Sequence, residues 1–503
     1  MSATRNSCRD VLGTGLIFFS AMFMCLSAVA QAPAAKGLRA GAAKTNITPP
    51  LGGLIVGGFS PLPSDDVHDE LHVRALVLTE GLGAGQGRAI GDAAAIDAER
   101  TIAFVLCDNV GISREVFDAA KLLVHAETGL RAENLLMAST HTHSAVSART
   151  RNAMVVTDDL SDYQRFVSRR IADAVRLALK RLAPAKIGWG WVDEPSELFN
   201  RRWFVSEEKE RRNPFGGVDQ VRMNPGGGAT LIRPAGPIDP QISFVSVQHS
   251  DGKPLAVLAN YSLHYVGGVP GRAISADYFA EFAERIKAKL GAIDRDPEFI
   301  GILSNGTSGD VNNIDFQNRA KSLPNYEKIR KVGELVAQRV ADGMRDLEYR
   351  DHVAIGARGS ELSLGVRKPT PEMLSNAKKI LDKPETSEKY HVHERAYAER
   401  ILLQAEAGET VDVPLQVLRI GELGIAAVPF EVFTEMGLEI KQRSPLKPTF
   451  TIELAGGSFG YLPTPPQHAL GGYETWLGTN KVEVDASTKI VARLMELFDQ
   501  VKQ

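Results

Sequence analysis

Two histidines follow an apolar segment in the stretch LLMASTHTHSAVS, residues 135–147. Side chains alternate between the two faces of a β-strand, so a strand running through this stretch would point His141 and His143 the same way. Paired imidazoles at a strand end suit a metal ion, because histidine is the commonest metal ligand in proteins. They equally suit a hydrogen-bonded pair in the core. This stretch alone leaves both interpretations open.

Other polar side chains follow apolar segments in the same way. His264 ends AVLANYSLH, Asp310 follows FIGILSNGTSG, Glu431 follows GIAAVPF, and Tyr461 follows TFTIELAGGSFG. Loops at the ends of buried strands are where α/β proteins place their sites. One such residue is more often structural than functional, but the repeated placement favours a shared site.

Two histidines, one glutamate and a further oxygen donor can form a zinc shell that leaves room for a water molecule. Such a water loses a proton near neutral pH and can attack a carbonyl carbon or a phosphorus atom. His143 need not be a metal ligand in this arrangement. It could hold a proton or donate to a developing oxyanion.

Three other motifs compete for a functional role. His391 and His393 repeat the H-x-H spacing in HVHER, but we expect a charged helix there, on which the two side chains would project about 200° apart and lie at the surface. GGSFG matches a nucleophile elbow around Ser458, yet prolines follow where that motif needs a helix, so a loop is expected. His68 and Asp69 precede a strand and are candidates for the rim or outer shell of the site.

Alternating strands and helices surround these residues and predict a mixed α/β fold with hairpins and βαβ pieces. Residues 200–240 are rich in Gly, Pro and Arg and indicate a long loop of the kind that lines a site. Residues 366–411 indicate a helical surface insertion. The expected strands include RTIAFVLCD and NLLMAST, the expected hairpins turn at Asp251-Gly252 and at Gly421, and the expected helices include SREVFDAAKLLVHAETG, DYQRFVSRRIADAVRLALKRLAP and DYFAEFAERIKAKLG.

The composition is that of a globular protein, with 503 residues, 44% hydrophobic, 24% charged and a formal net charge of −3. No Lys/Arg-rich tract is present, so nucleic acid is not an expected partner and a small molecule is. The start of the chain has the features of a signal peptide over residues 1–30: Arg5 and Arg9, an apolar run, and Ala28-Val29-Ala30. A linker is expected over 31–43 and a single domain over 44–503. The mature chain would keep only Cys107, so we expect an exported protein without internal disulfides or membrane spans.

Taken in order, the motifs resemble the neutral (non-lysosomal) ceramidase family. The similarity runs from GAAKTNITPPLGG through LHVRALVL, ASTHTHS, NYSLH, NGTSGDV and VLRIGELGIAAVPFEVFTEMG to GYLPTPPQHALGGYE, which is nearly all of the mature chain. The resemblance implies a zinc amidase with a mixed α/β catalytic domain. The implied zinc ligands are His141, His264, Glu431 and Tyr461. The implied catalytic residues are His143, Tyr473 and Arg201, the last being ambiguous because Arg202 is adjacent.

The chain departs from that family in two places. The family's GDVSPN loop carries a serine where this chain has Asn312, and we expect no counterpart of the family's C-terminal β-sandwich after the last helix. We expect Asp310 and Asn312 to contact substrate, and long-chain ceramide to be a poor one. The resulting prediction is an exported zinc hydrolase of an amide bond in an N-acylated, small or lipid-like substrate. The alternatives are a metal-dependent esterase or other hydrolase of a polar substrate, and a non-catalytic binding protein on the same scaffold.

Overall fold

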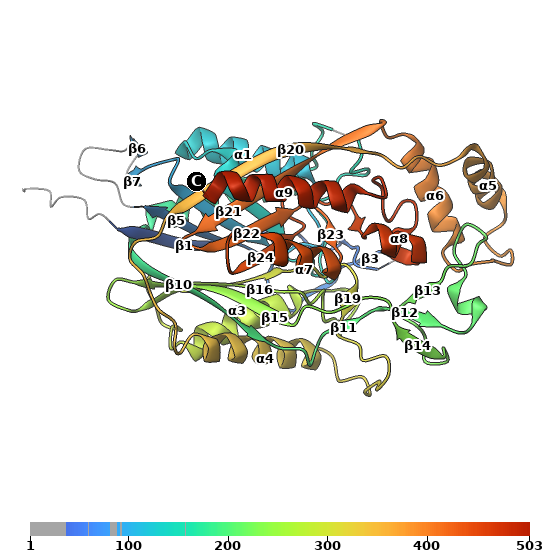
Figure 1. The fold of residues 1–503 in the computed structure, drawn as a ribbon, viewed down its shortest axis with the longest axis horizontal. Coiled ribbons are helices and arrows are strands. Elements are labelled where there is room, and N and C mark those ends of the chain that lie inside the picture. The colour runs from blue at the N-terminus through green and yellow to red at the C-terminus, as the bar shows by residue number, and fades with distance from the viewer. Residues whose placement is uncertain (1–36, 59, 81–87, 91–92, 156, 503) are drawn as a thin grey trace, which may run out of the picture.

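The computed structural model describes residues 37–502, apart from 59, 81–87, 91–92 and 156 (Figure 1). The predicted signal peptide over 1–30 lies outside the described residues. Among the described helices, none combines the length and the apolar composition that a membrane crossing requires.

An eight-stranded sheet forms the centre of the molecule, in the order β18-β16-β15-β10-β1-β5-β8-β9. Most neighbours are antiparallel, but β8 and β9 are parallel, as are β16 and β18. Both faces of the sheet are covered, which explains why its strands read as nearly unbroken apolar runs. The strands are β1 Leu38–Asn46, β5 His72–Glu80, β8 Thr101–Cys107, β9 Leu135–Ser139, β10 Ala183–Asp193, β15 Gln241–His249, β16 Pro254–Tyr261 and β18 Ile300–Asn305.

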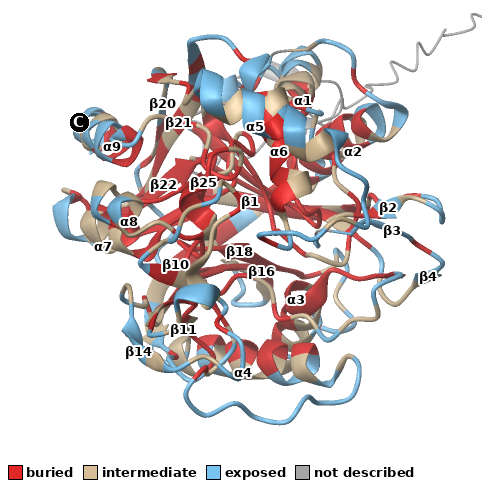
Figure 2. Cartoon of the chain, turned by 90° about the vertical axis from the view of Figure 1, so that its right-hand side faces the viewer, coloured by how far each residue is buried: buried red, intermediate tan, exposed pale blue. Residues whose placement is uncertain are grey.

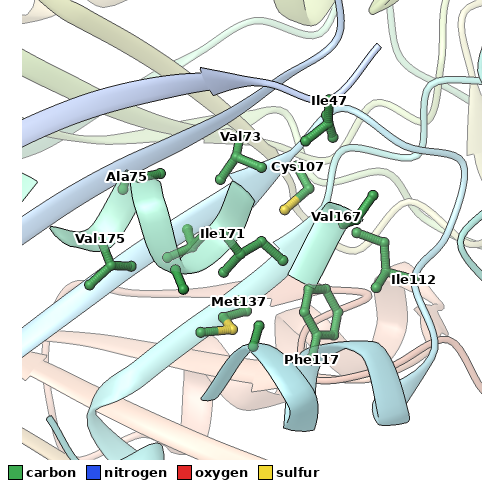
Figure 3. Close-up of a cluster of buried hydrophobic side chains, with 14 of the residues drawn as sticks. Ile47, Val73, Ala75, Cys107, Ile112, Phe117, Met137, Val167, Ile171 and Val175 are labelled. Atoms are coloured by element: carbon green, nitrogen blue, oxygen red, sulfur yellow. The ribbon is translucent and has the colours of Figure 1, made fainter. Parts of the chain in front are cut away.

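Four helices cover one face of this sheet: α1 Arg114–Thr128, α2 Asp162–Lys180, α3 Asp277–Lys289 and α4 Glu327–Gly343. Helix α1 ends as predicted at Gly129, whose left-handed φ of 74° suits glycine. Helix α2 begins at a capping box between Ser161 and Gln164. Figure 3 shows how α1 and α2 pack on the sheet through Phe117 and Ile171.

A second, four-stranded sheet packs against the opposite face of the large sheet, in the order β20-β21-β22-β24. Its strands are β20 Ile355–Gly365, β21 Thr410–Ile420, β22 Leu423–Val428 and β24 Thr449–Glu453. Its outer face is covered by α7 Thr434–Arg443 and α9 Ala486–Lys502. The molecule is therefore layered helix, sheet, sheet, helix, with both sheets buried between helices whose outer sides are exposed (Figure 2). This confirms the predicted mixed α/β class.

Shorter elements connect the layers. They are β2 Leu54–Ile55, β3 Leu62–Pro63, β4 Asp66–Val67, β6 Arg88–Ile90, β7 Ala93–Ile96, β11 Phe199–Asn200, β12 Arg202–Val205, β13 Val221–Met223, β14 Leu231–Pro234, β17 Ala273–Ile274, β19 Val311–Asn312, β23 Glu431–Val432, β25 Tyr461–Leu462 and α8 Pro465–Leu470. The expected long loop over 200–240 includes β12, β13 and β14, which form a small sheet.

From Leu38 onward, the structure has a strand where the sequence predicts the end of a linker over 31–43; residues 31–36 lie outside the described residues. Strand β1 begins at Leu38 and lies in the middle of the large sheet between β10 and β5, with Ala40 and Ala43 fully buried. The sequence predicts a linker here because small residues are common in linkers. In the structure these residues allow close packing, since a Cβ on Gly41 would lie only 2.1 Å from the carbonyl oxygen of Ala178 in α2.

The helical insertion predicted over 366–411 is present. Strands β20 and β21 pair along their whole length, and the chain between them forms α5 Pro371–Asp382 and α6 Glu394–Ala405. These helices lie at the end of the molecule that also holds β23 and the β12–β14 sheet, on the right in Figure 1. Their position matters, because α6 contributes to the cavity described below.

Candidate metal centre

Three predicted site residues lie just beyond strands that belong to parallel pairs. His141 follows β9, His264 follows β16 and Glu431 follows β22, which pairs in parallel with β24. Parallel neighbours end on the same side of a sheet, so their loops are brought together. A hydrogen bond from Asn305 Nδ2 to the carbonyl oxygen of Thr140 (3.0 Å) ties the end of β18 to the end of β9.

His141 reaches the site through an unusual backbone conformation. Strand β9 ends at Ser139, and His141 has a φ of 64°, a left-handed value that is uncommon for residues other than glycine. Its Nδ1 lies 2.5 Å from the carbonyl oxygen of Val110, so Nδ1 donates and the lone pair of Nε2 faces the site. The expectation of two histidines on one strand face is wrong, but the rings meet: the Nε2 atoms of His141 and His143 lie 3.1 Å apart.

His264 is oriented in the same manner. Its Nδ1 lies 3.0 Å from the carbonyl oxygen of Ser308 and 3.1 Å from the Ser308 hydroxyl. The ring has no solvent exposure, and its Nε2 has no hydrogen-bond partner in the described part of the chain. A buried nitrogen in that state is costly unless another group binds it.

Glu431 completes the convergence. Its Oε2 lies 3.4 Å from Nε2 of His141 and 3.7 Å from Nε2 of His264, and within the described residues this oxygen also lacks a hydrogen-bond donor. Three buried lone pairs therefore face one small volume. Such an arrangement is unfavourable by itself and fits a divalent cation, for which two imidazoles and a carboxylate are the usual donors of a zinc site.

His143 offers a second arrangement of the same centre. The ligand atoms of His141, His143 and His264 all lie within 4.8 Å of one another, so three imidazoles could also hold an ion. The His143 ring is half-buried and stacks on Tyr265, with ring centroids 3.7 Å apart. This stack fixes the ring beside His141 whether it binds the metal or serves the reaction.

The protonation states suit a metal site. Burial, followed by the proximity of His141, holds the pKa of both His143 and His264 well below the usual value, so both imidazoles are neutral. Burial acts to raise the pKa of Glu431, but interaction with His141 and a hydrogen bond from Tyr461 outweigh it, and the pKa is lowered. Neutral imidazoles and an ionised carboxylate are the forms that bind metal.

Tyr461 lies beside Glu431 because two short strands pair. Strands β23 and β25 are parallel, and Glu431 and Tyr461 are direct partners in their register. Tyr461 is nearly buried, and the Arg201 guanidinium lies 5.3 Å from the centroid of its ring. The fourth ligand implied by the family resemblance is thus adjacent to the third.

The structure separates Arg201 from Arg202. Arg201 contacts Tyr461, while its Nε donates to Glu474 (2.9 Å) and its Nη2 to the carbonyl oxygen of Gly309 (2.9 Å). Arg202 points elsewhere: it donates to Glu474 (2.6 Å) and to the carbonyl oxygen of Gly471 (2.7 Å). One buried carboxylate thus orients both arginines, and Arg201 is the one beside the site.

Tyr473 also lies beside the metal centre. Its ring meets that of Tyr461 edge to face, with centroids 5.6 Å apart, and burial raises its pKa. Both tyrosines line a cavity of about 370 Å³ that also reaches Glu431. The remaining walls come from the residue after β2, the loop after His143, helix α6, the loop before Tyr461 and the loop after Tyr473. They are Val56, Ser147, Arg149, Thr150, Arg151, Asn152, Ala153, Arg400, Leu403, Gln404, Ser458, Gly460, Gly478, Thr479 and Lys481.

Asp310 and Asn312 are placed differently from the metal ligands. Asp310 is fully buried; its carboxylate accepts from the backbone and hydroxyl of Thr434 (2.9 and 2.8 Å) and from Asn200 (2.9 Å). The side chain of Asn312 donates to Asn224 (2.6 Å) and accepts from the backbone of Ile314 (2.9 Å). These hydrogen bonds stabilise the loop. They give no support for the predicted contact of Asp310 with substrate.

The contacts of His68 and Asp69 are with the neighbouring loops rather than with the candidate metal ligands. The His68 ring stacks on Tyr326 with centroids 3.7 Å apart. Asp69 accepts from the hydroxyl of Ser275 (2.5 Å) and from the backbone of Ala276 (2.7 Å), at the start of helix α3. They shape the neighbouring loops.

Sequence reasoning missed a buried carboxylate behind His264. Glu453 accepts hydrogen bonds from the hydroxyl of Ser308 and from the backbone of Val432 (2.7 Å), and burial holds its pKa well above the usual range. Ser308 thus links this carboxylate to His264. The strand-end pattern applies to this residue too, because Glu453 ends the strand TFTIE and the other site residues follow apolar strands.

His391 and His393 were wrongly predicted to lie on a surface helix. They precede α6, and His391 is 7% exposed, with its ring edge-on to Trp476. The prediction failed because the helix begins only at Glu394. Ser458 lies in a loop, as predicted.

No family model and no curated protein matches the sequence at a significant level. The fold is similar to that of solved ceramidases. A ceramidase complexed with C2 superposes with a TM-score of 0.66 at 15% identity, over 92% of this chain and 75% of that one. Neutral ceramidase from Pseudomonas aeruginosa gives 0.62 at 17% identity, over 92% and 74%. The resemblance noted from the sequence motifs is therefore confirmed in the architecture: this chain has the fold of a neutral ceramidase.

Proposed function

We propose that this protein is a zinc-dependent hydrolase that cleaves an amide bond in an N-acylated substrate. The observation that carries the proposal is the convergence of Nε2 of His141, Nε2 of His264 and Oε2 of Glu431 in a buried volume, with Glu431 also lining a cavity. The chemistry that zinc supplies at such a site is acidification of water and polarisation of a carbonyl. Tyr461 would be the fourth ligand.

The chain's own residues would then carry the remaining steps. His143 holds a neutral imidazole with its Nε2 directed at the centre, so it can accept a proton and return it to the leaving amine. Arg201 is fixed by Glu474, and its charge lies over Tyr461. Tyr473 presents a hydroxyl donor that stays protonated at neutral pH because burial raises its pKa. Arg201 and Tyr473 are the donors we assign to a developing oxyanion.

An amide is proposed as the scissile bond because the fold neighbours are ceramidases, and ceramide is an N-acyl amide. The test is hydrolysis of a panel of N-acyl amides, ceramide included, by purified protein before and after chelation. Activity should disappear on chelation and return with added zinc. Full activity in the metal-free protein would contradict the proposal, and tight binding without turnover would identify a binding protein on this scaffold.

We also propose that the protein is exported. Support comes from Arg5 and Arg9, the apolar run that follows them, and the small residues that end it. Protein isolated from its natural host should begin near Gln31 to Pro33 when its N-terminus is sequenced. A mature chain that begins at Met1 would contradict export through this segment.

A further inference from the structure

The cavity beside the metal centre is strongly cationic. Its lining includes Arg149, Arg151, Arg400 and Lys481, and Glu431 is its one carboxylate among the described residues. The chain as a whole has 58 Lys and Arg against 61 Asp and Glu. The overall composition therefore does not explain the excess of cationic side chains in this cavity. If Glu431 holds a divalent metal, its charge is already neutralised and the excess of positive charge in the cavity increases.

The cations are positioned by neutral partners. Arg149 Nε donates to the hydroxyl of Ser147 (3.1 Å), and Arg400 donates to that of Thr479 (3.3 Å) with its guanidinium 4.8 Å from the centroid of the Tyr397 ring. Within the described residues, Arg149, Arg151 and Lys481 form no ion pair with a carboxylate. These three charges are therefore not neutralised by an ion pair.

Two separate segments bring these charges together. Arg149 and Arg151 belong to the loop after His143, which is tied to α6 by a hydrogen bond from Asn152 to the carbonyl oxygen of Leu403 (2.9 Å). Lys481 comes from the loop after Tyr473. Burial, then repulsion from Arg149 and Arg400, lowers the pKa of Lys481 to about 8. Like charges gathered around one cavity attract an anion.

We propose that the substrate of this enzyme carries an anionic group close to its scissile amide, and that Lys481 and Arg149 bind that group. This rests on the proposed amidase function and specifies its substrate class. Glu431, Tyr461 and Tyr473 line the same cavity, so a bound anion lies within a few bonds of the reacting carbonyl. A volume of about 370 Å³ suits a small acidic group with part of a chain.

The lining argues against a neutral two-chain lipid. Its aliphatic side chains are few: Val56, Ala153 and Leu403. An N-acyl amino acid, with its carboxylate on the amine half, and the half-amide of a dicarboxylic acid, with its carboxylate on the acyl half, both match the cavity. The shared chemistry is a carboxylate next to an amide.

Kinetics on matched substrates test the inference in the metal-loaded wild-type protein. N-nonanoylglycine should be cleaved with a kcat/KM about tenfold or more above that of N-nonanoylglycinamide, since a hydrogen bond to a charged group is worth about that factor. A second pair, N-succinyl-nonylamine and its terminal amide, places the carboxylate on the acyl half of the substrate. The pair that shows the larger ratio of kcat/KM for acid over amide identifies the half of the substrate whose carboxylate the cavity binds. Equal kcat/KM for acid and neutral partner in both pairs would overturn the inference while leaving the amidase function intact.

Variants then assign the preference to the cavity. Lys481→Met should lower kcat/KM for the preferred acid about tenfold and leave the neutral amide nearly unchanged. Lys180→Met, at the exposed end of α2, is the matched control and should behave as wild type. An equal loss on acid and amide in Lys481→Met would show a structural role and contradict the assignment.

A binding measurement keeps the inference independent of catalysis. The probe is the keto acid in which a methylene replaces the amide nitrogen of N-nonanoylglycine, compared by calorimetry with the corresponding keto amide. The acid should bind about tenfold more tightly than the amide, and Lys481→Met should remove the difference. This result without hydrolysis of any amide would refute the proposed function but support the anion site. Equal affinities would overturn the site.

Discussion

His264→Ala should purify with little of the metal that wild-type protein holds. One closed ligand set implies about one zinc per chain in wild type. The imidazole of His264 has no solvent exposure and an Nε2 without a hydrogen-bond partner in the described residues, so its removal deletes a ligand that nothing nearby replaces. Elemental analysis of the purified protein gives the stoichiometry, and activity on an N-acyl amide should fall to background.

Two further variants make that result specific. Glu431→Gln keeps the shape of the side chain but removes its charge, so metal should again be lost while circular dichroism reports a folded protein. His249→Ala removes a histidine at the turn of the β15–β16 hairpin and should keep full metal content. Wild-type activity without stoichiometric metal would refute the metal centre.

His143→Ala should keep its zinc and lose most of its turnover. If His143 handles a proton or an oxyanion, kcat should fall roughly 100- to 1000-fold, the usual cost of removing one such donor. Metal analysis and steady-state kinetics on the same preparation separate the two functions of the histidine pair.

A control for His143 exists elsewhere in the fold. His68 stacks on Tyr326 with the same centroid distance, 3.7 Å, as His143 on Tyr265. His68→Ala removes an equivalent stack outside the metal centre and should leave kcat near that of wild type. Loss of zinc in His143→Ala to the extent seen in His264→Ala would instead make His143 a ligand, with the three imidazoles holding the ion.

The strand-end pattern identified side chains that the structure brings together, because the topology requires it. His264 and Glu431 follow apolar strands that belong to parallel pairs, and the ends of such strands must meet. The same pattern selected Asp310, whose carboxylate accepts hydrogen bonds from Thr434 and Asn200. The sequence pattern predicts that a residue lies at the end of a strand, but it does not predict which neighbouring groups its side chain binds.

The cationic cavity could not be foreseen from the sequence. Arg149, Arg400 and Lys481 are far apart along the chain, and each alone looks like an ordinary surface charge. They meet because the β20–β21 hairpin carries α6 to the end of the molecule where the loop after His143 lies. Likewise, β1 looked like a linker because small residues carry little apolar signal, although close packing against α2 requires them.

The pairing of β23 with β25 fixes two of the candidate ligands in place before any ion binds. Glu431 and Tyr461 are held by backbone pairing at the fixed spacing of neighbouring strands, about 4.8 Å. The Nδ1 atoms of both histidines are anchored on carbonyl oxygens. The donors are thus preorganised before any ion binds. In a zinc finger, by contrast, part of the metal-binding free energy drives the folding of the chain. If a metal binds at this centre, its binding energy is available for affinity and for selection by ionic size, and we expect the metal-free protein to keep its fold.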